Sequence, residues 1–373
     1  MRDAPTSGKT PPATMAFSAP AALFLDQPPP QDLPGLQDPP LTPLPLPPLL
    51  CPHPLSLLTW EGIQIPTTNE CRLLGLHFDS MLCMREHHAQ IKKRLQSQLN
   101  QMKGLAGTTW GSNKELMLTT FKAITKPGAT YACQSWSQLV KPTRMDSLDS
   151  SYRAILRVCC GLTKDTPGYH IHDEAGILPL SHKIKLMNQQ YAISMIKSAG
   201  HPSNGLTGRR KLARNTTRSS KPPREPPLDF PDKTLDDWKN HPGSTKSLQK
   251  LNHTKFVAHF LANRPTNKIL GTAAPKICKS EEELPRETRT ELARLRCGHS
   301  RLCGSYVARI ENRSISPCRK CGSVEGDVNH LLTCISSVPL LPKDLWEKPV
   351  EVAEALGLST TPFDPGGNGT TPP

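Results

Sequence analysis

Apolar residues recur along this chain at two spacings, and the spacing changes near residue 85. From about 60 to about 80, apolar and polar residues alternate around a turn, which predicts a β-hairpin. Its expected inward positions are Ile63, Ile65, Leu74, Leu76 and Phe78. Beyond this hairpin the spacing becomes helical.

The first helical pattern has apolar residues at intervals of four, four and three: Ile91, Leu95, Leu99 and Met102. Side chains at this spacing share one face of a helix, so we predict an amphipathic helix with a basic side. Gly104 and Gly107 are expected to end it.

Two later helices carry capping patterns at their N-terminal ends. Ser112 and Glu115 form a capping box ahead of one apolar stripe, and Pro127 is expected to stop that helix. Thr143 and Asp146 repeat the pattern ahead of the next stripe.

Three apolar stripes then support a helical domain. They contain Leu116, Leu118, Phe121 and Ile124; Leu148, Tyr152, Ile155 and Cys159; and Ile184, Met187, Tyr191, Ile193 and Ile196. Gly161 is the expected end of the second helix, and the third runs from about 180 to about 199. The predicted fold class is therefore mainly α, with the hairpin and the helical block together spanning 56–200.

Proline marks the regions that are not expected to fold. The chain has 39 prolines in 373 residues, concentrated in "DQPPPQDLPGLQDPPLTPLPLPPLLCPHP". Because proline lacks an N–H donor, residues 1–55 are predicted to be a disordered or polyproline II arm. A "PxxP" ligand for an SH3-type domain is the alternative to a plain linker.

Periodicity also breaks after residue 200, at "HPSNG", "KPPREPPLDFPD" and "NRPTNK". We therefore predict an irregular basic and proline-containing linker over 201–280. A small C-terminal unit over 281–358 follows, with Leu292 and Leu295 on the inner face of a helix. Residues 359–373 are expected to be a disordered tail.

The formal charge of +14 and the pI near 9.3 predict a polyanionic partner, of which nucleic acid is the natural class. The densest basic run is "RRKLARNTTRSSKPPR" over 209–224, with no acid in it. Its first candidates for phosphate contact are Arg209, Arg210, Lys211 and Arg214. A solvated linker or a nuclear import signal explains the same run.

No stretch of about twenty apolar residues is free of proline or charge, and "MRDAPTSGKT" lacks the apolar core of a signal peptide. The sequence therefore favours a soluble protein with no membrane partner, in the nucleus or the cytoplasm. In such a compartment the 12 cysteines favour metal binding and reduced thiols over disulfides.

The strongest chemical signal is "SPCRKCGSVEGDVNHLLTC". Cys318 and Cys321 lie two residues apart with Gly322 behind them, so a tight turn can direct both thiolates at one cation. His330 and Cys334 are four residues apart, on one face of a short helix that Asp327 can cap.

These four ligands, Cys318, Cys321, His330 and Cys334, complete a tetrahedron with no open position, which predicts a structural zinc ion. Ordinary buried cysteines are the alternative. A nearby cluster of Cys297, His299 and Cys303 could supply a second or an alternative ligand set. Packing or a reactive thiol suits these three residues better, because they lack a complete fourth partner nearby.

One order of segments is more specific than any single motif: "RLLGLHFDS", "HHAQIKKRL", "MKGLAGTTWGSNKELMLTTFKAI", "YACQSW", "LDSSYRAILRVCCGLTKDTP" and "EAGILPL". This order resembles the segment after the palm in reverse transcriptases of jockey-like non-LTR retrotransposons. The tail, with "LRCGHSRLCGSYVARI", "CRKCGSVEGDVNHLLTC" and "KDLWEKPVEVAEAL", resembles the Cys/His C-terminal end of the same polyproteins. The two blocks cover roughly residues 60–200 and 285–358.

The resemblance implies that 56–200 is a thumb-like domain that grips a nucleic-acid duplex. Candidate phosphate contacts are then Lys92, Lys93, Arg94 and Lys103, unless these side chains only solvate the first helix. Apolar landmarks of the family, expected in the core, are Trp110, Tyr131, Trp136 and Leu178.

The chain departs from the family in its catalytic parts. Polymerases of this class need palm carboxylates to hold two Mg²⁺ ions, and no aromatic-x-Asp-Asp turn is present. The single Asp pair, Asp236 and Asp237, lies in the predicted linker and lacks strand residues around it. Residues 1–55 leave no room for the endonuclease. Mg²⁺ is thus expected only if a palm domain is supplied, and catalytic residues are absent.

We therefore read the sequence as the C-terminal remnant of a reverse transcriptase, without RNA-directed DNA polymerase activity of its own, that binds RNA or DNA with little sequence preference. Two alternatives stay open. The chain is a fragment of an active enzyme whose palm is encoded upstream, or it is a domesticated protein-interaction scaffold.

Overall fold

The computed structural model describes residues 59–60, 63–64, 68–198, 200–201, 239–271, 274–318, 320–336 and 338–360. The chain divides into two compact units, Met1–Pro66 and Thr67–Pro373. In the first unit, β1 (Thr59–Trp60) pairs antiparallel with β2 (Ile63–Gln64). The described part does not include the predicted arm over 1–55, Ile65 or the side chain of Ile63.

The second unit begins with its own antiparallel hairpin, β3 (Glu70–Leu73) and β4 (Leu76–Asp79). The single hairpin expected from the sequence is thus two separate ones. Leu74 and Gly75 form the turn with φ of 48° and 83°, the signs that a type I′ turn requires. As a turn residue Leu74 is 82% exposed, so its predicted inward position is wrong, whereas Leu76 is buried and Phe78 packs on the core.

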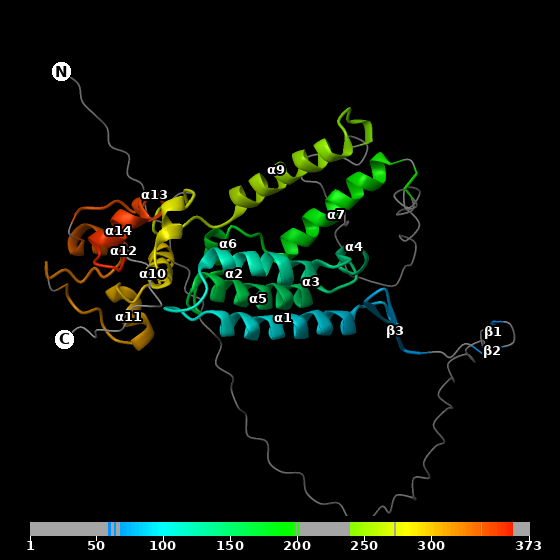
Figure 1. The fold of residues 1–373 in the computed structure, drawn as a ribbon, viewed down its shortest axis with the longest axis horizontal. Helices are drawn as coiled ribbons and strands as arrows, with labels where there is room; N and C mark the ends of the chain where they lie inside the picture. Colours follow the sequence, from blue (N-terminus) through cyan, green and yellow to red (C-terminus); the bar gives the residue numbers. More distant parts are fainter. Residues whose placement is uncertain are drawn as a thin grey trace, which may run out of the picture. The chain divides into compact units, whose positions relative to one another are not determined.

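The rest of this unit is helical (Figure 1). Its elements are α1 (Arg85–Leu105), α2 (Lys114–Thr120), η1 (Phe121–Thr125), α3 (Lys126–Thr130), α4 (Cys133–Trp136), α5 (Pro142–Cys160), α6 (Gly168–Ala175), α7 (Leu180–Lys197), α9 (Thr245–Asn263), η4 (Lys279–Glu283), α10 (Arg286–Arg296), α11 (Gly304–Glu311), α12 (Val328–His330), η5 (Leu331–Ile335), α13 (Asp344–Glu347) and α14 (Pro349–Ala355). The chain is therefore mainly helical, as the sequence predicts.

The described residues form two hydrophobic cores. Helix α5 lies at the centre of the first core, where it packs against α1, α2, α6 and α7. Its predicted stripe is confirmed, because Leu148, Tyr152, Ile155 and Cys159 are all fully buried. The predicted stripe over α2 and η1 is partly wrong. The buried apolar side chains of these two elements include Met117, Leu118 and Phe121, while Leu116 and Ile124 are each 55% exposed. Of the α7 stripe, Tyr191 is 40% exposed.

Helix ends follow the backbone chemistry only in part. Gly161 ends α5 in the left-handed region, as expected. Asn113 caps α2, accepting a hydrogen bond from the Leu116 N–H, and Glu115 pairs with Arg289, so the predicted Ser112–Glu115 capping box is wrong. Helix α5 starts with proline at its first position, so Thr143 is not its cap.

Pro127 does not stop the second helical run. The π-helical segment η1 precedes it, and Pro127 lies in the first turn of α3. A proline has no N–H to donate, and a first-turn position needs none. The chain therefore continues past the proline by changing its hydrogen-bond pattern.

The four apolar residues that the resemblance places in the core divide between core and surface. Trp136 is fully buried and donates its indole N–H to the Tyr131 carbonyl oxygen at 2.8 Å. Leu178 is half-buried. Tyr131 and Trp110 are 54% and 58% exposed, so their predicted core positions are wrong. The Tyr131 hydroxyl donates instead to the Leu74 carbonyl oxygen at 3.0 Å and holds the β3–β4 turn.

The predicted irregular linker contains a long helix. Ser244 caps α9, whose buried side chains are Leu248, Asn252 and Phe256, and the helix packs against α7. Buried Asn252 donates a hydrogen bond to Gln189. Because Asn252 is polar, the buried face of α9 does not appear as an apolar stripe in the sequence. Residues 202–238 of the predicted linker lie outside the described part.

The C-terminal segment forms a second core around Leu292, Leu295, Leu332 and Trp346. The inner positions predicted for Leu292 and Leu295 are confirmed. Helix α10 joins the two cores, because its Ala293 side chain belongs to the first one. None of the described helices combines the length and apolar character that crossing a membrane would require.

Candidate metal centre

Cys318 and Cys321 lie in a tight turn. The Gly322 N–H donates to the Cys318 carbonyl oxygen at 2.8 Å, and the Cys318 N–H donates to the Ser323 carbonyl oxygen at 2.7 Å. Gly322 has a φ of 74°, which glycine adopts at little cost. The turn therefore presents both thiols to the same side.

The other two ligands come from a short helix. The Asp327 carboxylate accepts a hydrogen bond from the His330 N–H at 2.8 Å, as the predicted cap. From Leu331 the helix continues as the π-helical segment η5, which contains Cys334. His330 and Cys334 therefore share one face.

The four donor atoms lie within 4.8 Å of one another. The Cys318 and Cys334 sulfurs are 4.0 Å apart, and the Cys321 sulfur is 3.7 Å from His330 Nε2. A tetrahedral zinc ion with bonds of about 2.3 Å to sulfur and about 2.0 Å to nitrogen separates two sulfurs by about 3.8 Å and sulfur from nitrogen by about 3.5 Å. The Cys/His group, Cys318, Cys321, His330 and Cys334, could thus hold a metal ion such as zinc.

Without a cation the thiols of this group influence each other's protonation. A hydrogen bond with His330 lowers the pKa of Cys318 to about 6. Hydrogen bonding to Cys321 raises the pKa of Cys334 to about 11. Metal ligation requires deprotonated thiols and a neutral imidazole, so binding would release protons.

The Cys/His group stands on the second core. Val328, Leu331 and Leu332 on the same short helical run are buried, whereas Cys321 is exposed and the other three ligands are half-buried. Ahead of the helix, the Gly326 carbonyl oxygen accepts hydrogen bonds from Ser305, whose N–H lies 2.9 Å away. An ion here would join the turn to the helix and both to the core.

The alternative ligand set does not assemble. Cys297 lies in the first core and Cys303 in the second, and burial raises the pKa of both thiols. The His299 ring stacks on Tyr306 with centroids 5.2 Å apart. Among the described residues, the metal-binding geometry is found at the Cys/His group and not at these three.

No family model, curated protein or solved structure matches this chain. The functional assignment therefore depends on the geometry of the sites and on the motifs of the sequence.

The four candidate basic residues of α1 differ in their contacts. Lys92, Lys93, Arg94 and Lys103 are all exposed, opposite or beside the buried side chains of the helix. The Arg94 guanidinium turns toward α3 and donates to the Gly128 carbonyl oxygen at 3.3 Å. Lys92, Lys93 and Lys103 remain as an open basic face. The candidates of the linker, Arg209, Arg210, Lys211 and Arg214, lie outside the described residues.

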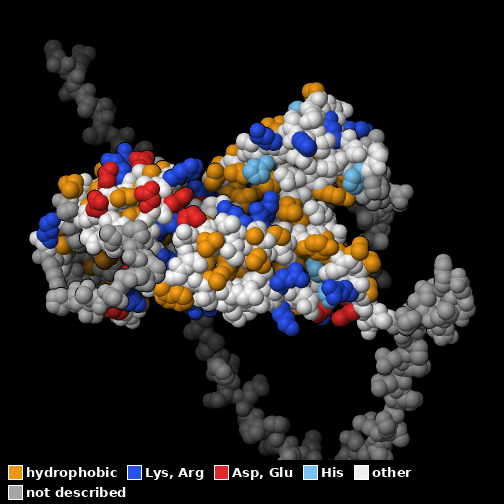
Figure 2. Space-filling model, viewed as in Figure 1, with side chains coloured by type: hydrophobic (Ala, Val, Ile, Leu, Met, Phe, Trp, Pro, Cys, Tyr) orange, Lys and Arg blue, Asp and Glu red, His pale blue; other side chains and the backbone are white. Residues whose placement is uncertain are grey.

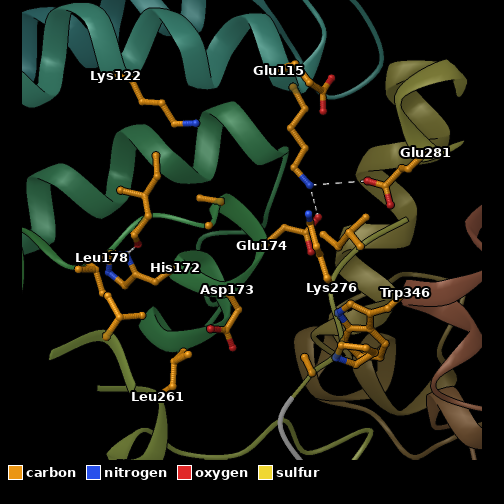
Figure 3. A pocket seen from close by; sticks show the side chains of 18 of the residues that line it. Glu115, Lys122, His172, Asp173, Glu174, Leu178, Leu261, Lys276, Glu281 and Trp346 are labelled. Carbon is orange, nitrogen blue, oxygen red and sulfur yellow. Dashed lines mark hydrogen bonds and ion pairs between the residues drawn. The ribbon is translucent and has the colours of Figure 1, made fainter. Parts of the chain in front are cut away.

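Sequence reasoning missed a buried ion cluster, Lys114, Glu174, Glu281 and Arg296, which Figure 3 shows in part. Lys114 Nζ lies 2.5 Å from Glu174 and 3.6 Å from Glu281, and Arg296 pairs with both carboxylates. Burial opposes the charge of Lys114, but the two carboxylates outweigh it and raise the Lys114 pKa. The cluster joins α2 and α6 to η4 and α10.

A cavity of about 870 Å³ adjoins this cluster (Figure 3). Its walls come from segments that are far apart along the chain, between Lys114 and Trp346. No local motif marks it, so the sequence offered no signal for it.

Proposed function

We propose that this chain is the C-terminal remnant of a non-LTR retrotransposon reverse transcriptase and binds nucleic acid through its helical, thumb-like block. The open basic face of α1 carries the proposal. This helix has five basic side chains and one acidic side chain, Glu86, whose carboxylate accepts a hydrogen bond from Gln90. From Lys92 to Lys103 the helix contains no acid. Exposed lysines suit a phosphate backbone and read no base sequence.

The order of the sequence motifs supports the reverse-transcriptase origin. The polymerase reaction would require palm carboxylates that hold Mg²⁺, and the printed sequence contains no aromatic-x-Asp-Asp turn to supply them. What remains is a surface for the duplex or the single strand. Binding should therefore depend on charge and fall steeply with salt.

The Cys/His group has a supporting role in this proposal. With four protein ligands, a bound zinc ion has no open position for substrate, so it stabilises the fold. Its residues would fix the turn at Cys318 and the helix at His330 against the second core. The ion would supply folding free energy to the turn at Cys318, which has few buried apolar side chains of its own.

The test is binding of the full chain to labelled duplex and single-stranded oligonucleotides by fluorescence anisotropy. A variant with Lys92, Lys93 and Lys103 replaced by glutamine should bind more weakly, with a salt dependence shallower by about one phosphate contact per lysine. The matched control replaces Lys164, Lys246 and Lys343, which are exposed elsewhere and carry the same charge. Equal loss in the two variants would contradict a role for α1.

A further inference from the structure

The cavity of about 870 Å³ is a cleft whose lining includes Lys122, Lys126 and Lys183, and also Lys276 and Lys279. Lys122 and Lys126 come from η1 and α3, and Lys183 comes from α7. Figure 3 shows Lys122 extending toward the cavity above His172 and Leu178, and Figure 2 shows lysine and arginine side chains gathered beneath α9. We call this feature the lysine cleft.

Lys122, Lys126 and Lys183 carry uncompensated charge. Within the described part of the chain, none of them has an ion-pair partner. Lys183 is half-buried, and its burial together with the charge of Lys126 lowers its pKa. Lys126 is half-buried as well, whereas Lys122 is exposed. Like charges close together in a partly desolvated site, as at Lys126 and Lys183, are unfavourable in the free protein, and an anion would relieve their repulsion.

The acids of the cleft are already neutralised. Glu174 and Glu281 pair with Lys114 and Arg296 in the buried ion cluster. In the same way, Asp173 pairs with Arg264, and Glu115 with Arg289. The one remaining acid of the lining, Glu282, is exposed to solvent. The lining lysines without an ion pair among the described residues, Lys122, Lys126 and Lys183 together with the exposed Lys276 and Lys279, are therefore the groups of the cleft that can accept negative charge.

Other groups of the cleft suit an organic ligand. The Tyr152 hydroxyl and His172 Nε2 are buried and have no hydrogen-bond partner among the described residues. Such groups are costly unless a ligand or water satisfies them. On the side of α9, Val257, Phe260 and Leu261 add an apolar wall. A cavity of this volume is in the usual range for small-molecule sites.

We propose that the lysine cleft binds a nucleoside phosphate, with the phosphate between Lys122, Lys126 and Lys183 and the base against the apolar wall of α9. The ligand is either a free mononucleotide or one nucleotide unit of a single strand. The site is separate from the basic face of α1, and its occupation does not require the proposed function to be correct.

The experiment titrates the full chain with AMP, adenosine and inorganic phosphate by isothermal titration calorimetry. AMP should bind at one site, and adenosine should bind at least about tenfold more weakly, because it lacks the charge-assisted hydrogen bonds. The variant K122Q/K126Q should lower AMP affinity by about tenfold to a hundredfold. Because this change removes a like-charge contact, the variant should fold at least as stably as the wild type.

The matched control is K164Q/K185Q, which removes the same charge from exposed sites, one of them on α7, outside the cleft. A second arm uses a 5′-phosphorylated oligothymidine strand. If AMP does not bind the wild type and K122Q/K126Q loses strand binding, the ligand is a nucleotide unit of a strand, and the site is supported. Unchanged binding of both AMP and the strand in this variant would overturn it.

The two proposals fail in different ways. If replacement of Lys92, Lys93 and Lys103 abolishes strand binding while AMP binding persists, the lysine cleft stands on its own. If AMP binds to the wild type and to K122Q/K126Q alike, the cleft proposal is wrong whatever α1 does.

Discussion

Replacing Glu174 with glutamine should destabilise the chain strongly, because it removes one of two carboxylates that hold two buried cations. Glu174 Oε1 lies 2.5 Å from Lys114 Nζ and 3.0 Å from Arg296 Nη1, and all three side chains are at most 9% exposed. Glutamine keeps the size of the side chain but leaves a net charge inside the protein. Breaking a buried ion pair in this way costs about 3–5 kcal/mol.

The assay is urea unfolding of the full chain followed by far-ultraviolet circular dichroism. The matched control is Glu311→Gln, because Glu311 pairs with Arg313 at 2.8 Å but both side chains are more than half exposed. An exposed pair contributes about 0–1 kcal/mol. The free energy of unfolding should therefore fall several times more in Glu174→Gln than in Glu311→Gln.

The pH dependence provides a second check. Burial opposes the charge of Glu174, yet Lys114 and Arg296 outweigh it and hold its pKa well below 4.5. A lowered pKa contributes stability above pH 4.5, and this contribution is lost as the pH falls toward the folded-state value. The difference between wild type and Glu174→Gln should shrink below that pH. A difference under about 1 kcal/mol at neutral pH, or one that does not change with acid, would refute the reasoning.

Three further changes test other parts of the structure. Gly326→Ala should lower the free energy of unfolding by about 1–3 kcal/mol in the same assay, because an added Cβ would lie 2.7 Å from the Ser305 backbone nitrogen. A cost near zero would mean that this contact relaxes. Cys334→Ser should reduce bound zinc, measured by inductively coupled plasma mass spectrometry, from one equivalent per chain to well below one. Chelation should lower the thermal midpoint of the wild type and leave this variant unchanged, and equal shifts would argue against a metal centre. Leu74→Asn should raise the free energy of unfolding by about 0.5–1 kcal/mol in the urea assay, since asparagine tolerates the left-handed turn better than leucine does. A lower free energy of unfolding would show that Leu74 stabilises the exposed turn in another way.

The parts that the sequence predicts well are those set by short-range spacing. The turn at Cys318, the cap at Asp327 and the stripe of α5 depend on residues within one or two helical turns of each other. Helix ends were less predictable, because proline changed its role with the surrounding hydrogen bonds. At Pro142 it begins α5, and at Pro127 the π-helical segment η1 carries the chain past it.

The parts that local patterns cannot predict bring distant residues together. Lys114 and Glu174 are 60 positions apart, and Arg296 is 122 positions from Glu174. A charged residue is normally read as exposed, so a buried ion cluster has no sequence signature. The lysine cleft was not predicted either. Its walls include α9, and the buried face of this helix contains the polar Asn252, so the sequence shows no clear apolar stripe there.

The salt dependence of nucleic-acid binding tests the central claim most directly. Affinity of the full chain for a labelled duplex should be measured by fluorescence anisotropy from about 50 mM to about 200 mM salt. The proposed backbone contacts predict a linear fall of the logarithm of affinity with the logarithm of salt, and a shallower line when Lys92, Lys93 and Lys103 are replaced by glutamine. Affinity that does not change with salt, or no binding at 50 mM, would contradict the proposal that this chain binds nucleic acid through α1.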